Sequence, residues 1–263
     1  MLMAWDPFAT VFPHTNLSHA PLRWAEGGGY AFDGVPLLVR PQKRTPRAPR
    51  PSTVCLLPKA GSTFLKAHLA FAILPTVGGG CNTVHCSRLS YPLPSPADAL
   101  RFETTPAFIV VRHPVPRLLS AFLCARANVA VRASARALLR GSRNATFSEF
   151  VAAVTAVAPA SSLNPHFRLQ TQQCGWQDAA VRARYKVLKL EHARHWIRSL
   201  LTVWWGLPWT AEQQRRVRNA TGSAVADALV TTHYTPTLLD TVEAWARADV
   251  RAFGYAPWPR TSC

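Results

Sequence analysis

Acidic residues are scarce in this chain. Its 263 residues include only 13 Asp plus Glu against 30 Lys plus Arg, which leaves a formal net charge of +17. Arginine supplies most of the excess, and its planar guanidinium pairs well with phosphate and sulfate. We therefore expect an anionic partner. Charge alone does not choose among nucleic acid, a nucleotide, an acidic polysaccharide and an anionic membrane surface.

Long apolar runs are also absent. No stretch approaches the roughly 18 uninterrupted apolar residues of a spanning helix, and the N-terminus lacks a basic-then-apolar signal pattern. We therefore expect no membrane span in this chain.

Cysteine is sparse as well. Six cysteines are too few for a disulfide scaffold at this length, and no CxxC pair indicates zinc, so no metal is expected. Cys81 and Cys86 form a bridge if the compartment is oxidising and otherwise stay as thiols. Sequons for N-glycosylation, usable only in the secretory pathway, stand at Asn16, Asn144 and Asn219.

Hydrophobic residues make up 48% of the chain, enough to bury the core of one α/β domain. Residues 1–50 show no periodicity and include a basic, proline-rich tract. We expect an irregular arm and linker over residues 1–50 and a single folded domain over residues 51–263.

A strand, a polar turn and a helix are predicted near the start of this domain. Residues 54–57 form a short apolar run typical of a buried parallel strand, and Leu65, Leu69 and Ile73 recur every fourth position, as on a helix. A helix N-terminus offers unpaired N–H groups and a positive dipole end, so the turn suits an anion. The polar residues of the turn are Lys59, Gly61, Ser62 and Thr63.

The order of residues in this turn differs from the Walker motif GxxxxGK[ST], in which the lysine directly precedes Ser or Thr. Here Lys59 precedes Gly61. An ordinary structural joint, in which Ser62 merely caps the helix, is the alternative.

A second strand and turn are predicted over residues 107–122. The apolar run 108–111 ends at Arg112, and the helix that follows carries Ser120. A third strand is predicted at residues 185–190. Because ligands bind at the carboxyl ends of parallel strands, we expect Arg112 on the same sheet edge as the first turn. The predicted fold is α/β, a P-loop-like three-layer α/β/α arrangement with a central parallel sheet.

An arginine-rich helical segment is predicted over residues 124–143. Two interpretations stay open for it. It is either a solvated helix face or a polyanion-binding ridge beside the active cleft.

Taken together, the motifs resemble those of the sulfotransferases. Residues 57–63 and 110–122 are similar to the paired donor-binding motifs of that family, and more narrowly to those of the Golgi carbohydrate sulfotransferases of the chondroitin 4-O and HNK-1 type. The resemblance continues in order through residues 147–151, 166–174, 185–191 and 245–255.

The resemblance implies a donor, 3′-phosphoadenosine 5′-phosphosulfate (PAPS), whose sulfuryl group passes in line to a hydroxyl of a glycan or other acceptor without a metal. Arg112 and Ser120 would grip the 3′-phosphate, and Lys59 would reach the bridging oxygen. The 5′-phosphosulfate side would lie on Lys59, Ala60, Gly61, Ser62, Thr63 and Phe64. The resemblance also implies a location in the Golgi lumen or membrane. An anionic acceptor stays open, and no nucleic-acid partner is expected.

The general base is the least determined part of the predicted site. His85, between the two donor motifs, and His166, in an Asn-x-His-Phe element, are candidates because histidine transfers protons near neutral pH. Glu191 is a third candidate, with a helix cap as the alternative. His113, between Arg112 and a proline, is expected to hold its turn.

Two departures from the family pattern concern the acceptor side. Phe167 stands where Trp is common, and the second Cys expected after Cys174 is missing. Two other functions stay open. A P-loop kinase or related transferase would need a magnesium ligand and a Walker lysine that the sequence lacks, and a non-catalytic basic module would bind polyanions.

Overall fold

The computed structural model describes residues 36–39, 52–61, 65, 91–92, 106–127, 129–142, 144–158, 162–204, 209–211, 214–215 and 222–260. All structural statements below concern these residues.

A five-stranded sheet in the order β3-β1-β2-β4-β5 forms the centre of the domain. Its three parallel strands are β2 (Ser52–Leu56), β4 (Ala107–Val111) and β5 (Tyr185–Lys189). These strands confirm the three that the apolar runs predicted. Two short antiparallel strands, β1 (Pro36–Val39) and β3 (Tyr91–Pro92), extend the sheet beyond β2.

The strand β1 lies inside the segment that we predicted to be an irregular arm. Its four residues pair antiparallel with β2, with Pro36 opposite Cys55 and Val39 opposite Ser52. An apolar run this short carries no detectable period, so only the pairing partner identifies it as a strand.

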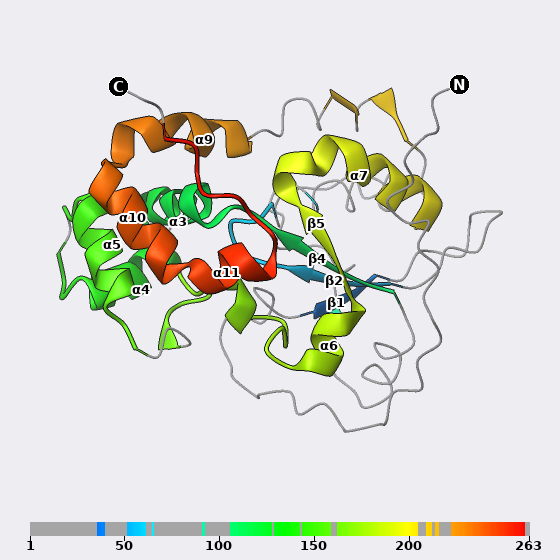
Figure 1. Ribbon diagram of the computed structural model, residues 1–263, viewed down its shortest axis with the longest axis horizontal. Coiled ribbons are helices and arrows are strands. Elements are labelled where there is room, and N and C mark those ends of the chain that lie inside the picture. The colour runs from blue at the N-terminus through cyan, green and yellow to red at the C-terminus, as the bar shows by residue number, and fades with distance from the viewer. Residues whose placement is uncertain are drawn as a thin grey trace.

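Both faces of the central strand β4 are buried, because its side chains alternate between two apolar clusters, whereas β5 at the edge of the sheet is only partly buried. One face packs on α7 (Ala193–Ser199) and the π-helical turn η4 (Leu200–Trp204). The other packs on α6 (Ala179–Arg184) and on Phe253. Figure 1 shows α7 and α6 on opposite sides of the sheet. These layers confirm the α/β fold.

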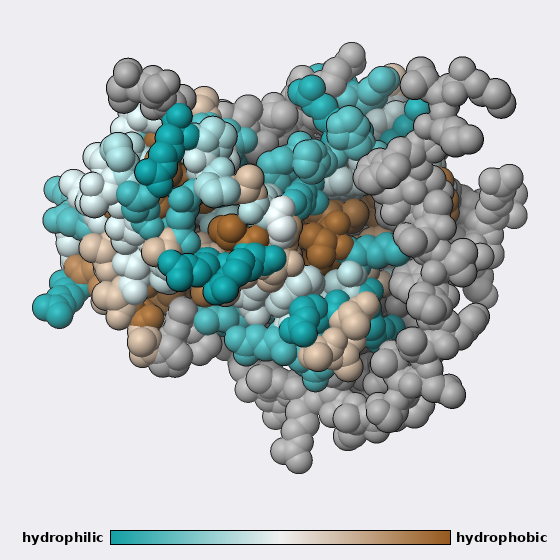
Figure 2. Space-filling model, in the orientation of Figure 1, coloured by the Kyte–Doolittle hydropathy of each residue, from teal (hydrophilic) through white to brown (hydrophobic). Residues whose placement is uncertain are grey.

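A group of helices packs beside the sheet around its own apolar cluster (Figure 1). Its members are α3 (Pro114–Ala127), α4 (Val129–Leu138), α5 (Phe147–Thr155), α9 (Gly222–His233) and α10 (Pro236–Trp245). The short helix α11 (Arg247–Ala252) follows α10. The face of the molecule that is turned to the viewer in Figure 1 is largely hydrophilic, with an apolar area over β5 (Figure 2).

The arginine-rich segment that we predicted as one helical stretch is divided between two helices. It covers the end of α3 and all of α4, and these helices are bent by 104° relative to one another. Among the described helices, none is by itself long and apolar enough to cross a membrane, although the bent pair passes that test by length and composition. The bend gives α4 a packing direction of its own.

A disulfide joins Cys55 of β2 to Cys174, which lies 119 residues further along the chain. The bridge expected from the sequence, between Cys81 and Cys86, concerns two residues that lie outside the described residues. Cys124 is a free thiol. The spacing of cysteines did not reveal the observed pair, because its two members meet only after the sheet has formed.

Candidate functional site

The turn after β2 is tight, and two of its residues have positive φ. Lys59 adopts a left-handed conformation, with φ 63°, and Gly61 has φ 86°. The Ala60 N–H donates to the Leu57 carbonyl at 3.2 Å, and the Leu65 N–H donates to the Gly61 carbonyl at 2.9 Å, which starts a helical turn. Ser62, Thr63 and Phe64, predicted to bind the donor, lie outside the described residues.

A lysine with a left-handed backbone conformation is unusual. Residues with a Cβ atom rarely adopt positive φ, and such strain concentrates at functional sites. Lys59 is half-buried, whereas its neighbours Pro58 and Ala60 are buried. The conformation therefore sets the direction in which the lysine leaves the turn.

The glycine of this turn is required by packing. A Cβ atom built on Gly61 would lie 2.5 Å from Cδ1 of Leu190, which belongs to the 3-10 helix η3 (Leu190–His192) after β5. The close neighbour that makes glycine necessary here is an apolar side chain from the adjacent layer, and the predicted role of Gly61 in binding the donor stays a prediction.

Arg112 follows β4 directly, and a side-chain amide holds its main chain. Gln170, in the 3-10 helix η2 (Gln170–Gln172), accepts from the Arg112 N–H at 3.0 Å and donates to the Arg112 carbonyl at 2.8 Å. The Gln170 N–H donates to the buried carboxylate of Asp249 at 2.8 Å. The Thr171 N–H and hydroxyl donate to the same carboxylate at 2.9 and 2.8 Å. This clamp fixes the point where the chain leaves β4.

The Arg112 side chain lies at the predicted sheet edge and already has a carboxylate partner. Its Nη2 donates to Oδ1 of Asp227, on α9, at 2.9 Å. The arginine side chain is 4% exposed and the aspartate side chain 36% exposed. Sequence analysis did not foresee Asp227. A phosphate bound at this edge would share the guanidinium with it.

The turn residue His113 is held from several sides, as predicted. It is buried, its Nε2 lies 3.0 Å from the Ala256 carbonyl, and its ring packs edge-on against Tyr255 and Trp258. Burial lowers the pKa of His113, and the Ala256 carbonyl and the charge of Glu191 oppose that shift only in part.

Glu191, a candidate base, has a structural role in the same turn. Its Oε1 accepts from the His113 N–H at 2.6 Å, and its Oε2 accepts from the Tyr255 hydroxyl at 3.1 Å. Burial, followed by the charge and hydrogen bond of Glu191, raises the pKa of Tyr255. Glu191 therefore anchors the Arg112-His113 turn to the end of the chain.

Arg117 is the least expected residue of the site, because it is a buried cation on an otherwise apolar stretch of α3. It is 2% exposed and donates to three carbonyl oxygens: Nε to Pro58 at 3.0 Å, Nη1 to Arg168 at 2.8 Å and Nη2 to Pro165 at 3.2 Å. Burial lowers the pKa of Arg117 to about 10, so it remains charged at neutral pH.

One planar guanidinium thus binds both the Lys59 turn and the loop that carries His166. Pro58 directly precedes Lys59, and the other two acceptors flank His166 in sequence. Ser120 lies one helical turn beyond Arg117 on the same face of α3, and its predicted contact with a 3′-phosphate stays a prediction.

His166 is oriented by a chain of two polar side chains. Its Nδ1 lies 2.9 Å from Oδ1 of Asn164, whose Nδ2 donates to the Ser134 hydroxyl of α4 at 2.9 Å. A carboxamide oxygen only accepts, so the hydrogen of the neutral imidazole stands on Nδ1 and the lone pair on Nε2. That tautomer is the one that a general base acting through Nε2 needs.

The structure brings together most of the predicted residues that it describes. Lys59, Arg112 and His166 are linked through β2, β4 and the Arg117 guanidinium, whereas His85 lies outside the described residues and stays a prediction. Within the described part of the chain, no group of three or more His, Cys, Asp or Glu residues is placed to hold a metal ion.

The fold and this edge define an α/β protein with a basic turn at the carboxyl end of its parallel strands. The sequence model described as the sulfotransferase family matches residues 53–256. The protein belongs to the sulfotransferase family, and it is therefore a transferase. Searches among curated proteins and among solved structures found no match.

Proposed function

We propose that the protein transfers the sulfuryl group of PAPS to a hydroxyl of a carbohydrate acceptor. The observation that carries this proposal is the Arg117 guanidinium, which joins the Lys59 turn to the His166 loop. A group-transfer reaction needs a donor-binding element and a proton acceptor at a fixed separation. Arg117 provides that fixed separation from a buried position.

The described part of the turn suits a phosphosulfate donor. Lys59 supplies a cation in a constrained backbone, and Arg112 and Ser120 supply a guanidinium and a hydroxyl on the neighbouring elements. When bound, the donor supplies an activated sulfuryl group on a phosphate leaving group. Lys59 would stabilise the charge that develops on the leaving oxygen, because a fixed cation in a partly dry site interacts strongly with such charge.

His166 is the residue that we assign to the acceptor proton. Its Nδ1 is oriented by Asn164, so Nε2 would accept the proton of the attacking hydroxyl. Ser134 keeps the Asn164 amide from rotating, because it accepts from Nδ2. The positive charge formed on the imidazole would be stabilised by the Asn164 oxygen.

An oxidising, luminal compartment, such as the Golgi, is part of this proposal. The Cys55–Cys174 disulfide supports it, because structural disulfides persist mainly along the secretory route. Asn144, one of the predicted glycosylation sites, is exposed just before α5.

Two substitutions separate donor binding from transfer. Lys59→Ala should lower kcat by about 100-fold or more while sparing much of the affinity for the donor nucleotide. Arg112→Ala should weaken the binding of 3′-phosphoadenosine 5′-phosphate by about 10- to 100-fold, because a charge-assisted contact is lost. Calorimetry with this nucleotide and a labelled-donor assay on desulfated glycosaminoglycans and simple sugars measure the two effects.

Arg194→Ala is the control, because this exposed residue of α7 lies outside the site and its loss also removes one positive charge. It should leave both quantities within twofold of wild type. Failure of the wild-type protein to bind the nucleotide would overturn the proposal and favour a non-catalytic polyanion-binding protein. Unchanged nucleotide affinity in Arg112→Ala would overturn the assignment of the 3′-phosphate contact.

A further inference from the structure

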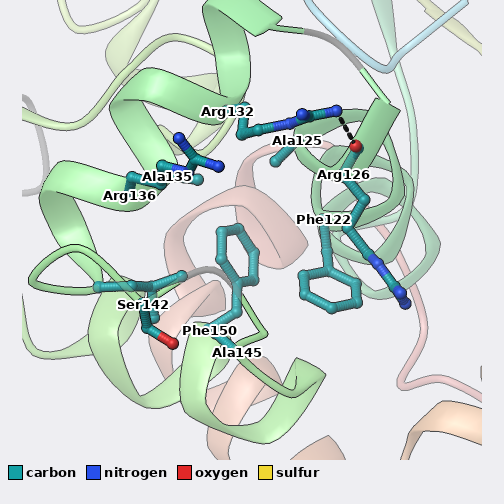
Figure 3. Close-up of a pocket in the computed structure, with 10 residues that line it drawn as sticks. Phe122, Ala125, Arg126, Arg132, Ala135, Arg136, Ser142, Ala145 and Phe150 are labelled. Atoms are coloured by element: carbon teal, nitrogen blue, oxygen red, sulfur yellow. Dashed lines mark hydrogen bonds between the residues drawn. The ribbon is translucent and has the colours of Figure 1, made fainter.

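A cavity of about 260 Å³ lies between α3, α4 and the start of α5, apart from the donor turn. Its polar lining is dominated by arginine, and no Asp or Glu is among the lining residues. The three arginines are Arg126, Arg132 and Arg136, and two aromatic rings, Phe122 and Phe150, form the opposite wall (Figure 3). The combination of guanidinium groups and ring faces without a carboxylate marks it as a site for an anion.

The three arginines do not play equal parts. Arg132 donates through Nη2 to the Arg126 carbonyl and so ties α4 to the end of α3. The Arg126 guanidinium lies 5.9 Å from the centre of the Phe122 ring. In Figure 3 the Arg126 side chain runs away from the middle of the cavity, whereas Arg136 points toward it.

Arg136 has one donor without a partner. Its Nε is buried, and no hydrogen-bond acceptor for it exists among the described residues. A buried charged donor without an acceptor is costly and calls for an explanation such as a bound ion. The buried Nε itself is closed to a ligand, but an anionic group in the cavity would offset the charge of the guanidinium by binding its outer Nη groups (Figure 3), since a guanidinium binds sulfate or carboxylate through parallel N–H groups.

The size of the cavity limits what enters it. A single water molecule occupies only about 30 Å³, and pockets for drug-sized ligands begin at roughly 300 Å³. A cavity of about 260 Å³ therefore suits one small charged group together with part of the ring that carries it. Phe122, which is 5% exposed, leaves a small apolar contact for the edge of a sugar, and the fully buried Phe150 backs the wall behind it.

The cavity is separate from the reacting edge, although α4 connects the two. Ser134, which orients Asn164 and thereby His166, lies two residues before Arg136 and so on roughly the opposite side of α4. The cavity is thus removed from His166 by about the width of a helix, roughly 10 Å. A sugar held by Arg136 is not the one that reacts.

We propose that this cavity binds a sulfate or carboxylate group of an acidic glycan chain, at a sugar other than the one that is sulfated. This proposal rests on the carbohydrate acceptor proposed above. It makes the acceptor an anionic polysaccharide and gives the arginine-rich segment a specific role. Of the two interpretations of that segment, a solvated face and a polyanion-binding ridge, it selects the second and places the contact at Arg136.

The test is direct binding of a chondroitin sulfate octasaccharide to the full chain by calorimetry, at low and at physiological salt. Arg136→Gln should weaken binding by about tenfold. Arg136→Lys keeps the charge but loses the planar guanidinium with its Nε donor, so it should lose less affinity for the octasaccharide than Arg136→Gln does. Arg198→Gln is the matched control, because this exposed residue of α7 loses the same charge far along the chain from the cavity. It should change the affinity by less than twofold.

Three further arms separate the possible outcomes. Inorganic sulfate should compete only weakly, since it lacks the sugar ring. A DNA octamer should lose no more affinity in Arg136→Gln than in Arg198→Gln. Affinity for 3′-phosphoadenosine 5′-phosphate and the thermal unfolding midpoint should stay unchanged in both variants. If the wild-type protein did not bind the nucleotide, the proposed function would be wrong, but the comparison of octasaccharide affinities would still be valid.

Equal losses of octasaccharide affinity in Arg136→Gln and Arg198→Gln would overturn the proposal, because they would show a nonspecific response to net charge. A loss for DNA as large as that for the octasaccharide would overturn it as well, because the cavity would then not select a glycan.

Discussion

Gly61 and Gly141 have almost the same φ, 86° and 88°, in very different surroundings. A Cβ atom on Gly61 would meet Leu190 at 2.5 Å, whereas nothing lies within 4 Å of one on Gly141. The strain of a side chain at positive φ is common to both positions. Any difference in stability between alanine variants at the two positions therefore reports the contact between the Lys59 turn and Leu190.

Gly61→Ala should lower the free energy of unfolding by more than Gly141→Ala does. The loss of unfolding free energy that comes from placing a Cβ atom at positive φ should be about 1–2 kcal/mol at both positions. Gly61→Ala should in addition weaken nucleotide binding, because Leu190 and the donor turn must move apart. Urea unfolding and calorimetry measure the two effects. Adding Leu190→Ala should restore part of the nucleotide affinity, and no restoration would argue against a steric cause.

The single residue His113 makes the free energy of unfolding depend on pH. Its folded pKa is lowered from the ordinary 6.5 because burial disfavours the charged ring. Between the two pKa values the unfolded chain binds more protons than the folded protein, so stability is complete above pH 6.5 and falls as the pH drops through the folded pKa.

Urea unfolding at pH 7.5, 6.5 and 5.5 should therefore show a decline toward acid that is smaller in His113→Gln. One such group contributes at most about 1.4 kcal/mol per pH unit. Other groups titrate in this range too, so the difference between the two proteins is the informative quantity. Parallel curves for wild type and His113→Gln would contradict the assignment.

Among the elements, α3 does more than bury an apolar face. Its first half carries Arg117, which holds the donor turn against the loop over Leu163–Arg168, and its second half lines the arginine cavity. The same loop is also closed internally, because Arg168 donates through Nε and Nη2 to the Leu163 carbonyl at 3.1 and 2.8 Å. Of the Arg117 and Arg168 hydrogen bonds, only those of Arg117 connect the loop to the Lys59 turn.

Arg117→Lys should lower kcat more than it lowers nucleotide affinity, because an ammonium cannot reach all three carbonyls in the planar fork geometry. We expect a loss of about 2–4 kcal/mol in the free energy of unfolding from the buried acceptors left unpaired. Arg168→Lys is the matched control: it should loosen the loop and leave nucleotide affinity unchanged. If Arg168→Lys weakened nucleotide binding as much as Arg117→Lys, the connecting role of Arg117 would be wrong.

At the scale of the whole molecule, the Cys55–Cys174 disulfide connects parts of the chain that are 119 residues apart. Cys55 lies in the strand that leads to the donor turn, and Cys174 follows the segment that holds Arg112 through Gln170. The bridge thus joins the two halves of the site across one face of the sheet. It also restricts the unfolded chain.

The double substitution Cys55→Ala/Cys174→Ala should lower the free energy of unfolding by about 4–5 kcal/mol, as expected for a closed loop of this length. Addition of a reducing agent should have a similar effect on the wild-type protein and none on the double variant. Cys124→Ala removes the free thiol and serves as the control. Equal stability of the double variant and wild type would show that the bridge is not structural.

Local pattern was enough to predict the three parallel strands and the shared edge of Lys59 and Arg112. These features follow from alternation and from the rule that parallel strands end at one edge, both of which act over a few neighbouring residues. The ordered motifs likewise predicted membership of the sulfotransferase family, which the match over residues 53–256 confirms.

Only the tertiary structure decided which side chains serve that edge. Arg117, Asp227 and Asp249 act through partners that lie far away in the sequence or through carbonyl oxygens that no residue type reveals. The sole local signal was a charged residue among the apolar residues of α3. The sequence by itself determined the strands, the turns and the chemical class. Packing decided the buried cation, the disulfide partner and the direction of Arg136, because these depend on how distant segments meet.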